Sequence, residues 1–147
     1  METINQYMTE DHRRCDELFA SAEDAASRGD WSACVEHFAG FRDTIGHHFA
    51  MEETVLFPAF ERATGMTAGP TQVMRGEHEQ MRGLLELMNA GLSRHDRQAF
   101  LGHAETLLIL MQQHNLKEEN VLYPMADRSL RAEAGALVER MRAVETA

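Results

Sequence analysis

The sequence predicts an all-α protein, an up-down-up-down four-helix bundle with an additional C-terminal helix. Apolar residues recur every three to four positions along nearly the whole chain, which is the period of an amphipathic helix, and the alternation typical of strands is absent. Tight connections separate the long helical segments, and short connections make neighbouring helices antiparallel. The length of 147 residues is that of one domain.

Most of the chain consists of two copies of one helical hairpin, because the sequence matches itself at an offset of 66 positions. The segment HFAMEETVLFP at 48–58 is matched by HNLKEENVLYP at 114–124. The same shift pairs the following side chains: His12 with His78, His37 with His103, His48 with His114, Glu52 with Glu118, and Glu53 with Glu119. The repeat therefore offers each of these groups twice.

Capping residues delimit the first hairpin. Its first helix begins at Thr9, a candidate N-cap, and ends at Gly29, and Asp30 caps a second helix that ends near Gly65. Pro58 lies late in this second helix, where the loss of a backbone hydrogen bond predicts a kink or an end.

The second hairpin has the same plan. Pro70 suits the first turn of its first helix, which ends around residues 93–95. Asp96 caps its second helix, which runs past Pro124, the counterpart of Pro58.

A final helix is predicted over 130–145, with Ser129 as its N-cap. We therefore divide the chain into a four-helix bundle at 1–128 and a C-terminal helix at 129–147. The apolar stripe of this last helix leaves two arrangements open, since it would pack either on the bundle or on a partner.

Four histidines are predicted to lie at one level of the bundle. His12 lies 17 residues before the turn at Gly29 and His48 lies 18 residues after Asp30. At ~1.5 Å per residue both are roughly 25–27 Å from that turn. The second hairpin places its own two histidines, His78 and His114, in the same relation to its turn.

Two glutamates share this level. Glu52 and Glu118 each follow a histidine by four residues, so each pair lies on one face of its helix. The inward stripes are otherwise apolar and contain no Lys or Arg. Burying two carboxylates without a compensating cation costs several kcal/mol each, so a metal is the expected compensation. The candidate metal ligands are His12, His48, Glu52, His78, His114 and Glu118.

Each hairpin would supply two histidines to one of two ions, and both glutamates would bridge them. Each ion would then retain room for water or a small diatomic molecule. Imidazole and carboxylate suit iron, manganese, zinc or cobalt. A carboxylate-bridged pair in a bundle favours iron or manganese over zinc. Ferritin-like sites use Glu-x-x-His, and no histidine here has a glutamate three residues before it.

These motifs resemble the hemerythrin-like HHE cation-binding domain. The resemblance covers about residues 4–128 and is carried by His12, HFAMEE at 48–53, Glu77-His78-Glu79 and HNLKEE at 114–119. It implies a non-haem di-iron centre in an up-down-up-down bundle, held by the six candidate ligands given above.

One position departs from oxygen-carrying hemerythrins. Those proteins have a further histidine four residues after the one on the third helix, where this chain has Arg82. Because the fifth imidazole is missing, we expect two equivalent and open irons, which places a carrier function in doubt.

Several neighbouring residues give weaker signals. Glu53 and Glu119 are expected to point outward into solvent, with metal ligation as the alternative. Tyr7 and Tyr123 are candidate hydrogen-bonding or redox neighbours of the centre. Cys15 and Cys34 are separated by about 16 Å along the bundle axis. This gap exceeds the ~7 Å limit for a disulfide, so both are expected to be reduced.

Composition limits the partners. The net charge of −10, from 24 acidic and 14 basic residues, disfavours nucleic acid and anionic membranes. The N-terminus lacks the features of a signal peptide, and the longest apolar run, at 107–111, is too short to span a bilayer. We expect a cytoplasmic monomer or homodimer.

The function that the resemblance implies is binding of dioxygen or nitric oxide for sensing, storage or sequestration. Two alternatives stay open. One is a di-iron oxidoreductase acting on peroxide, and the other is an iron-donor or interaction module in which the C-terminal helix docks a partner.

Overall fold

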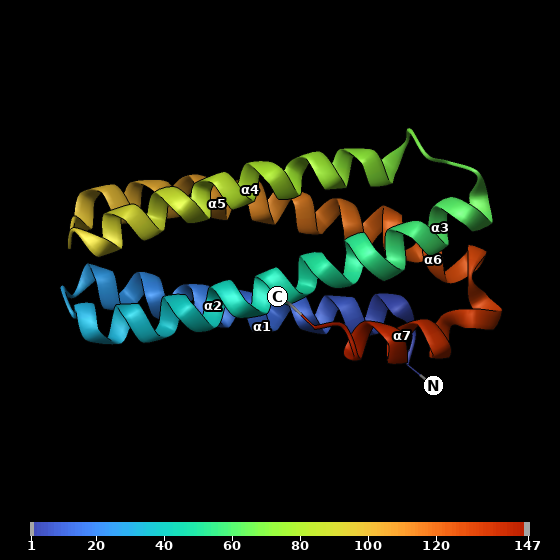
Figure 1. Cartoon of the computed structure of the whole chain (residues 1–147), viewed down its shortest axis with the longest axis horizontal. Helices are drawn as coiled ribbons and strands as arrows, with labels where there is room; N and C mark the ends of the chain where they lie inside the picture. The colour runs from blue at the N-terminus through green and yellow to red at the C-terminus, as the bar shows by residue number, and fades with distance from the viewer. Residues whose placement is uncertain (1, 146–147) are drawn as a thin grey trace.

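The computed structural model describes residues 2–145, and this range is helical throughout apart from its turns and ends (Figure 1). Residue 1 of the predicted bundle segment and residues 146–147 of the predicted C-terminal segment lie outside it. The elements in chain order are α1 (Ile4–Ser27), α2 (Trp31–Met51), η1 (Glu52–Leu56), α3 (Phe57–Thr64), α4 (Pro70–Ser93), α5 (Arg97–Lys117), η2 (Glu118–Leu122), α6 (Tyr123–Ser129), η3 (Arg131–Glu133) and α7 (Ala134–Arg142). The all-α prediction is confirmed.

The two antiparallel hairpins lie side by side, and both of their tight turns are at the left end of Figure 1. Asp30 accepts a hydrogen bond from the backbone N–H of Ala33 at 3.2 Å, and Asp96 accepts one from Ala99 at 3.1 Å. Both predicted N-caps are therefore confirmed. The residues before them, Gly29 and His95, are repeat partners, and both have a positive φ (71° and 52°).

Two other predicted caps are wrong. Helix α1 begins one turn and a half before Thr9, because Thr3 accepts a hydrogen bond from the Gln6 N–H and the Gln6 side chain accepts one from Thr3 in return. Ser129 is the last residue of α6 instead of the cap of a new helix. The final α-helix spans only Ala134–Arg142, shorter than the predicted 130–145, and no side chain caps it.

Neither proline ends its helix. Before each one, the helix widens into one π-helical segment, so that the Phe57 N–H bonds to the carbonyl of Glu52 and the Tyr123 N–H to that of Glu118. A proline ring collides with the carbonyl four residues earlier and donates no hydrogen bond, and a wider turn accommodates both effects. The predicted kink or end is thus replaced by a π segment.

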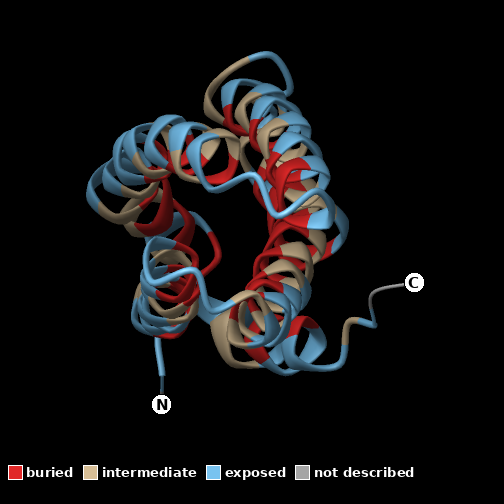
Figure 2. Cartoon of the chain, turned by 90° about the vertical axis from the view of Figure 1, so that its left-hand side faces the viewer, coloured by how far each residue is buried: buried red, intermediate tan, exposed pale blue. Residues whose placement is uncertain are grey.

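Apolar side chains form two clusters, one on each side of a polar layer. The first lies towards the hairpin turns and includes Phe19, Phe41 and Phe100. The second lies at the other end, where Leu137 and other buried residues of α7 pack against the start of α1 and against η1. Figure 2 looks along the bundle and shows the buried residues facing its interior.

Cys15 and Cys34 are buried and unpaired, as predicted. Within the described part of the chain, no helix combines the length and apolar character needed to cross a membrane.

Candidate metal centre

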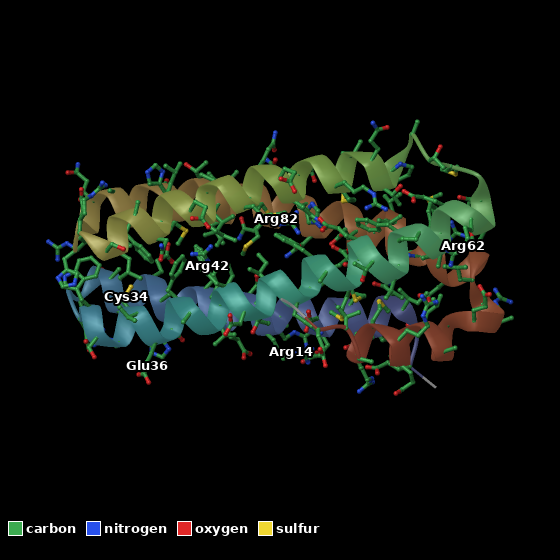
Figure 3. The ribbon with its side chains drawn as sticks, viewed as in Figure 1. Arg14, Cys34, Glu36, Arg42, Arg62 and Arg82 are labelled. Atoms are coloured by element: carbon green, nitrogen blue, oxygen red, sulfur yellow. The ribbon has the colours of Figure 1, made fainter. Side chains whose placement is uncertain are left out.

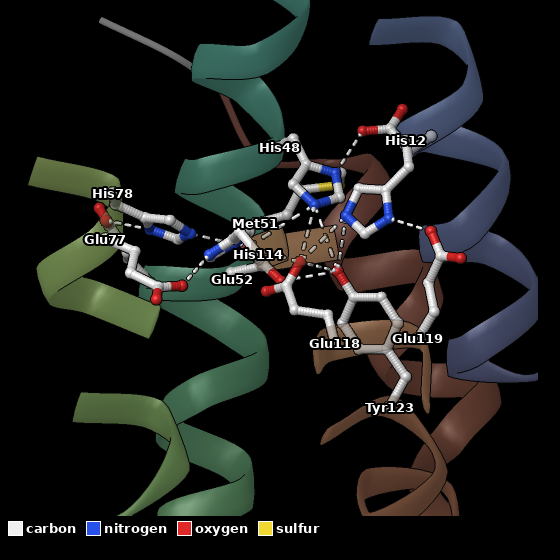
Figure 4. A network of polar contacts seen from close by, with 12 residues as sticks. His12, His48, Met51, Glu52, Glu77, His78, His114, Glu118, Glu119 and Tyr123 are labelled. Atoms are coloured by element: carbon white, nitrogen blue, oxygen red, sulfur yellow. Dashed lines mark hydrogen bonds and ion pairs between the residues drawn. The ribbon is translucent and has the colours of Figure 1, made fainter. Parts of the chain in front are cut away.

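The six predicted ligands come together in the polar layer between the two apolar clusters (Figure 4). All are buried, with at most 4% of any residue exposed. Ligand atoms of Glu52, His78, His114 and Glu118 lie within 4.8 Å of one another, and so do those of His12, His48 and Glu118. The groups separate the histidines of the two hairpins and share Glu118, which is the geometry expected for two adjacent cations.

Helix periodicity positions the donors. His48 and Glu52 lie one turn apart on the second helix, with 3.6 Å between His48 Nε2 and Glu52 Oε1. Across the bundle, His78 Nε2 on α4 lies 3.0 Å from the same Glu52 oxygen. Glu118 is placed in the corresponding way, 3.0 Å from His12 Nε2.

A second layer of carboxylates lies behind the histidines. Each histidine has Nδ1 within hydrogen-bond distance of an acidic side chain: His12 of Glu119 (2.7 Å), His48 of Asp11 (2.7 Å), His78 of Glu53 (2.7 Å) and His114 of Glu77 (2.8 Å). With Nδ1–H donating to these acids, the lone pair of each Nε2 faces the centre, as a metal-binding histidine requires.

This layer corrects one prediction. Glu53 and Glu119 do not point freely into solvent, because each contacts a histidine of the other hairpin. Sequence reasoning also missed Asp11 and Glu77 as partners of the centre. The usable signal was their position, since each immediately precedes a candidate ligand and the two are repeat partners.

Two buried atoms show that the donor set suits a cation. Among the described residues, Nε2 of His114 and Oε2 of Glu118 are the buried side-chain nitrogen and oxygen atoms without a hydrogen-bond partner. Buried polar atoms are normally paired, since desolvation without a partner is costly. Both atoms are Lewis bases in one layer, so a metal ion would satisfy them together.

The electrostatics of the two central carboxyl groups are linked. Burial, followed by the negative charge of Glu118, raises the pKa of Glu52. Burial also disfavours ionisation of Glu118, but hydrogen bonding to Glu52 and the charge of His114 hold its pKa well below the usual range. Negative charge on one carboxyl group therefore opposes ionisation of the other, and a bound cation would offset this repulsion.

Negatively charged carboxylates surround the four histidines. Burial alone would lower the pKa of His48, but the charge of Glu52 and the hydrogen bond to Asp11 outweigh it and raise that pKa to about 10. The same negative environment favours a metal cation, because an imidazolium group and a metal ion both carry positive charge.

Tyr123 projects a hydroxyl group into the centre from below (Figure 4). Its oxygen lies 2.7 Å from Glu52 Oε2 and 2.8 Å from Glu118 Oε1, so it donates to this pair of carboxyl groups. It also lies 3.3 Å from Nε2 of both His12 and His48. The predicted hydrogen-bonding role fits these contacts for Tyr123, whereas the Tyr7 hydroxyl lies 3.6 Å from the sulfur of Met51 instead.

Arg82 occupies the position of the fifth histidine of oxygen carriers. It donates to the two oxygens of Glu53 at 2.8 and 3.0 Å and stacks over the ring of Phe49, with 5.2 Å from its guanidinium carbon to the ring centre. The side chain therefore supports the second layer of carboxylates and offers no lone pair to a metal.

A small enclosed cavity adjoins the histidines on the side of the hairpin turns. The space open to the centre of a water-sized molecule is about 10 Å³. Its lining consists of His12, Cys15, Ile45, His48, Phe49, Met81, Met111, His114 and Asn115. The walls away from the imidazoles are thus mainly apolar, and the volume corresponds to about one water molecule.

The buried layer of imidazoles and carboxylates in this helical bundle could hold metal ions, as in a cation-binding helical protein. The hemerythrin HHE cation binding domain family matches residues 3–126, and the chain belongs to that family. It is also similar to the iron-sulfur cluster repair protein YtfE of Musicola paradisiaca (strain Ech703), with 32% identity over 119 residues. The match covers 71% of this chain but about half (52%) of that relative. No solved structure is significantly similar to the chain.

Proposed function

We propose that the protein binds two iron ions in the polar layer and, at them, a diatomic molecule, dioxygen or nitric oxide, for sensing, storage or sequestration. One ion would be held by His12 and His48 and the other by His78 and His114. Glu52 and Glu118 would bridge the pair. Family membership and the shared position of Glu118 in both donor groups support this assignment.

Bound iron would supply the electrons that hold a diatomic ligand reversibly. The protein's own groups prepare the site for it. The carboxylates at the four Nδ1 atoms fix the imidazole rings, so little reorganisation is needed on binding. The Tyr123 hydroxyl holds a proton at the bridging carboxyl pair, where it can serve as a hydrogen-bond donor.

The enclosed cavity is the single observation that carries the proposal for a diatomic ligand. It touches three of the four imidazoles and is otherwise lined mainly by apolar side chains such as Ile45 and Met111. A volume of about 10 Å³ accepts one small molecule and excludes larger organic substrates. Apolar walls favour uncharged diatomic molecules over ions.

The test is gas binding by the iron-loaded protein. Anaerobic protein exposed to dioxygen or nitric oxide should show an absorption change that reverses when the gas is removed. Ile45→Phe, which fills the cavity, should weaken this binding, whereas the control Ile45→Val should not. Undiminished binding in Ile45→Phe would contradict the proposed ligand site. Sustained oxygen release from hydrogen peroxide would assign the chain to enzymes instead.

A second candidate function is iron donation, and the name of the YtfE relative favours it. An iron donor must release its metal readily to an acceptor. The two functions differ in the rate at which a chelator removes iron. Because all six candidate ligands are buried, we expect slow removal, and rapid loss would favour donation. We place either function in the cytoplasm, where the buried Cys15 and Cys34 stay reduced.

A further inference from the structure

The internal repeat allows the two halves of the centre to be compared residue by residue. Most of the surroundings match, since Asp11 corresponds to Glu77 and Glu119 corresponds to Glu53. The positions four residues after His12 and His78 do not match. The first carries an acid, Asp16, and the second carries a base, Arg82.

Around His78 and His114, each outer carboxylate is balanced by a cation. Glu53 contacts His78 on one side and Arg82 on the other, and Arg82 also pairs with the exposed Glu79 on its own helix. Behind His114, Glu77 is paired with Lys117.

Around His12 and His48, only one of the two outer carboxylates is balanced. Asp11 is paired with Arg14, as Glu77 is with Lys117. Glu119 contacts His12, and no cation of residues 2–145 other than that histidine pairs with it. Asp16 adds a second negative charge nearby. Burial raises the pKa of Asp16, and although His12 opposes this effect, the charge of Glu119 raises it further.

The repeat also differs at the aromatic position beside the centre. Tyr123 stacks on His12 with ring centres 5.6 Å apart, and its counterpart Phe57 stacks on His78 at 5.7 Å. Only the tyrosine has a hydroxyl group, and this hydroxyl lies 3.3 Å from Nε2 of His12 and of His48. The position at His12 and His48, where Glu119 lacks a balancing cation, therefore also has one more oxygen atom nearby than the position at His78 and His114.

We propose that the two metal positions are inequivalent, and that the one at His12 and His48 binds a divalent cation more tightly and fills first. This inference rests on the proposed two-metal centre. The sequence led us to expect two equivalent irons because the fifth histidine is missing. The structure favours inequivalent positions instead, because Arg82 places a positive charge beside one of them only. Arg82 places a positive charge near the position at His78, and Asp16 places a negative charge near the position at His12. This difference changes the relative affinity of the two positions for a divalent ion by on the order of tenfold or more.

Titration of the metal-free full chain with cobalt(II) tests the proposal. Calorimetry and cobalt absorption, in low salt, should resolve two binding steps that differ in Kd by on the order of tenfold or more. His12→Ala and His78→Ala form a matched pair, since they remove the same group from the two halves. The tight step should weaken in His12→Ala and persist in His78→Ala.

A charge exchange at the helix surface provides a second test that leaves the ligands intact. The double variant Asp16→Arg/Arg82→Asp should reverse the order in which the positions fill. The control is a second exchange of opposite charges, Arg42→Glu/Glu86→Arg, at an ion pair that joins α2 and α4. Figure 3 shows Arg42 closer to the hairpin turns than Arg82. This control should leave both steps unchanged.

The outcomes separate the two proposals. Two steps of equal affinity would overturn the inequivalence, and tighter binding at His78 and His114 would overturn the proposed order of filling. Either result would leave the two-metal centre standing. An unaltered filling order in the Asp16→Arg/Arg82→Asp variant would overturn its electrostatic cause. Failure to bind cobalt at all would instead reject the proposed centre.

Discussion

Replacing Tyr123 with phenylalanine tests whether the two buried carboxyl groups of the centre depend on a hydrogen bond or a cation for their stability. The Tyr123 hydroxyl is fully buried and donates to Glu52 and Glu118 at 2.7 and 2.8 Å. A hydrogen bond to a buried charged group contributes about 1.5–3 kcal/mol, and its loss leaves the acceptor unsatisfied. For a chain of this length the melting temperature of metal-free protein should fall by roughly 3–12 °C.

The matched control is Tyr7→Phe. Among residues 2–145, the sulfur of Met51, at 3.6 Å, is the only hydrogen-bond partner of the Tyr7 hydroxyl, so its loss should cost less than about 0.5 kcal/mol. Thermal unfolding followed by circular dichroism compares both variants with the parent, with and without cobalt(II). The cost of Tyr123→Phe should shrink once cobalt is bound, because the cation then partners the carboxylates. Equal losses for the two tyrosines, or a Tyr123→Phe loss unaffected by cobalt, would refute this reasoning.

Three further predictions concern stability and reactivity. Because neighbouring carboxylates raise the pKa of His48 to about 10 from its ordinary 6.5, the metal-free native state binds more protons than the unfolded state between these values. The urea midpoint of metal-free protein should therefore fall as pH rises from 7 to 9.5. An increase in the midpoint would contradict the predicted direction of the change in stability. Burial raises the pKa of both Cys15 and Cys34, so iodoacetamide at pH 8 should label them only in denaturant; rapid labelling of native protein would show that the thiols are accessible. Gly91→Ala should cost about 1–3 kcal/mol, because the new Cβ would lie 3.1 Å from the backbone of α5. In the control Gly46→Ala, the new Cβ would meet no atom within 4 Å, so this variant should be more stable by about 0.5–1 kcal/mol in urea unfolding. Equal effects at both sites would contradict the close approach of Gly91 to α5.

The parts of the fold that depend on local chemistry were predictable from the sequence. Asp30 and Asp96 are the strongest capping residues next to tight turns, and both cap their helices. Pro70 begins α4, and Gly65 adopts the left-handed conformation that ends α3. The common level of the histidines followed from the constant helical rise together with the repeat.

Local chemistry was insufficient where tertiary contacts compete. Thr9 has good capping potential, but α1 continues upstream of it because Ile4 and Met8 pack into the second apolar cluster. The backbone N–H of Ile4 is also satisfied by Asp127, more than a hundred residues away in the sequence. A local sequence pattern cannot predict a hydrogen-bond partner that lies so far away in the sequence.

The second layer of carboxylates was missed for a geometric reason. An ideal α-helix turns Glu53 and Glu119 away from the face that carries the ligands. The π segments change that geometry at these residues, and each glutamate reaches a histidine on the opposite hairpin. The signals available were the proline that follows each segment and the repetition of the Glu-Glu pair.

The most direct measurement for the central claim is the iron content of protein that has been loaded anaerobically and then desalted. The proposed centre, built from a buried layer of four imidazoles and two carboxylates, predicts about two irons per chain. A ratio near zero, or a ratio that stays at two when Glu118 is replaced by alanine, would contradict it.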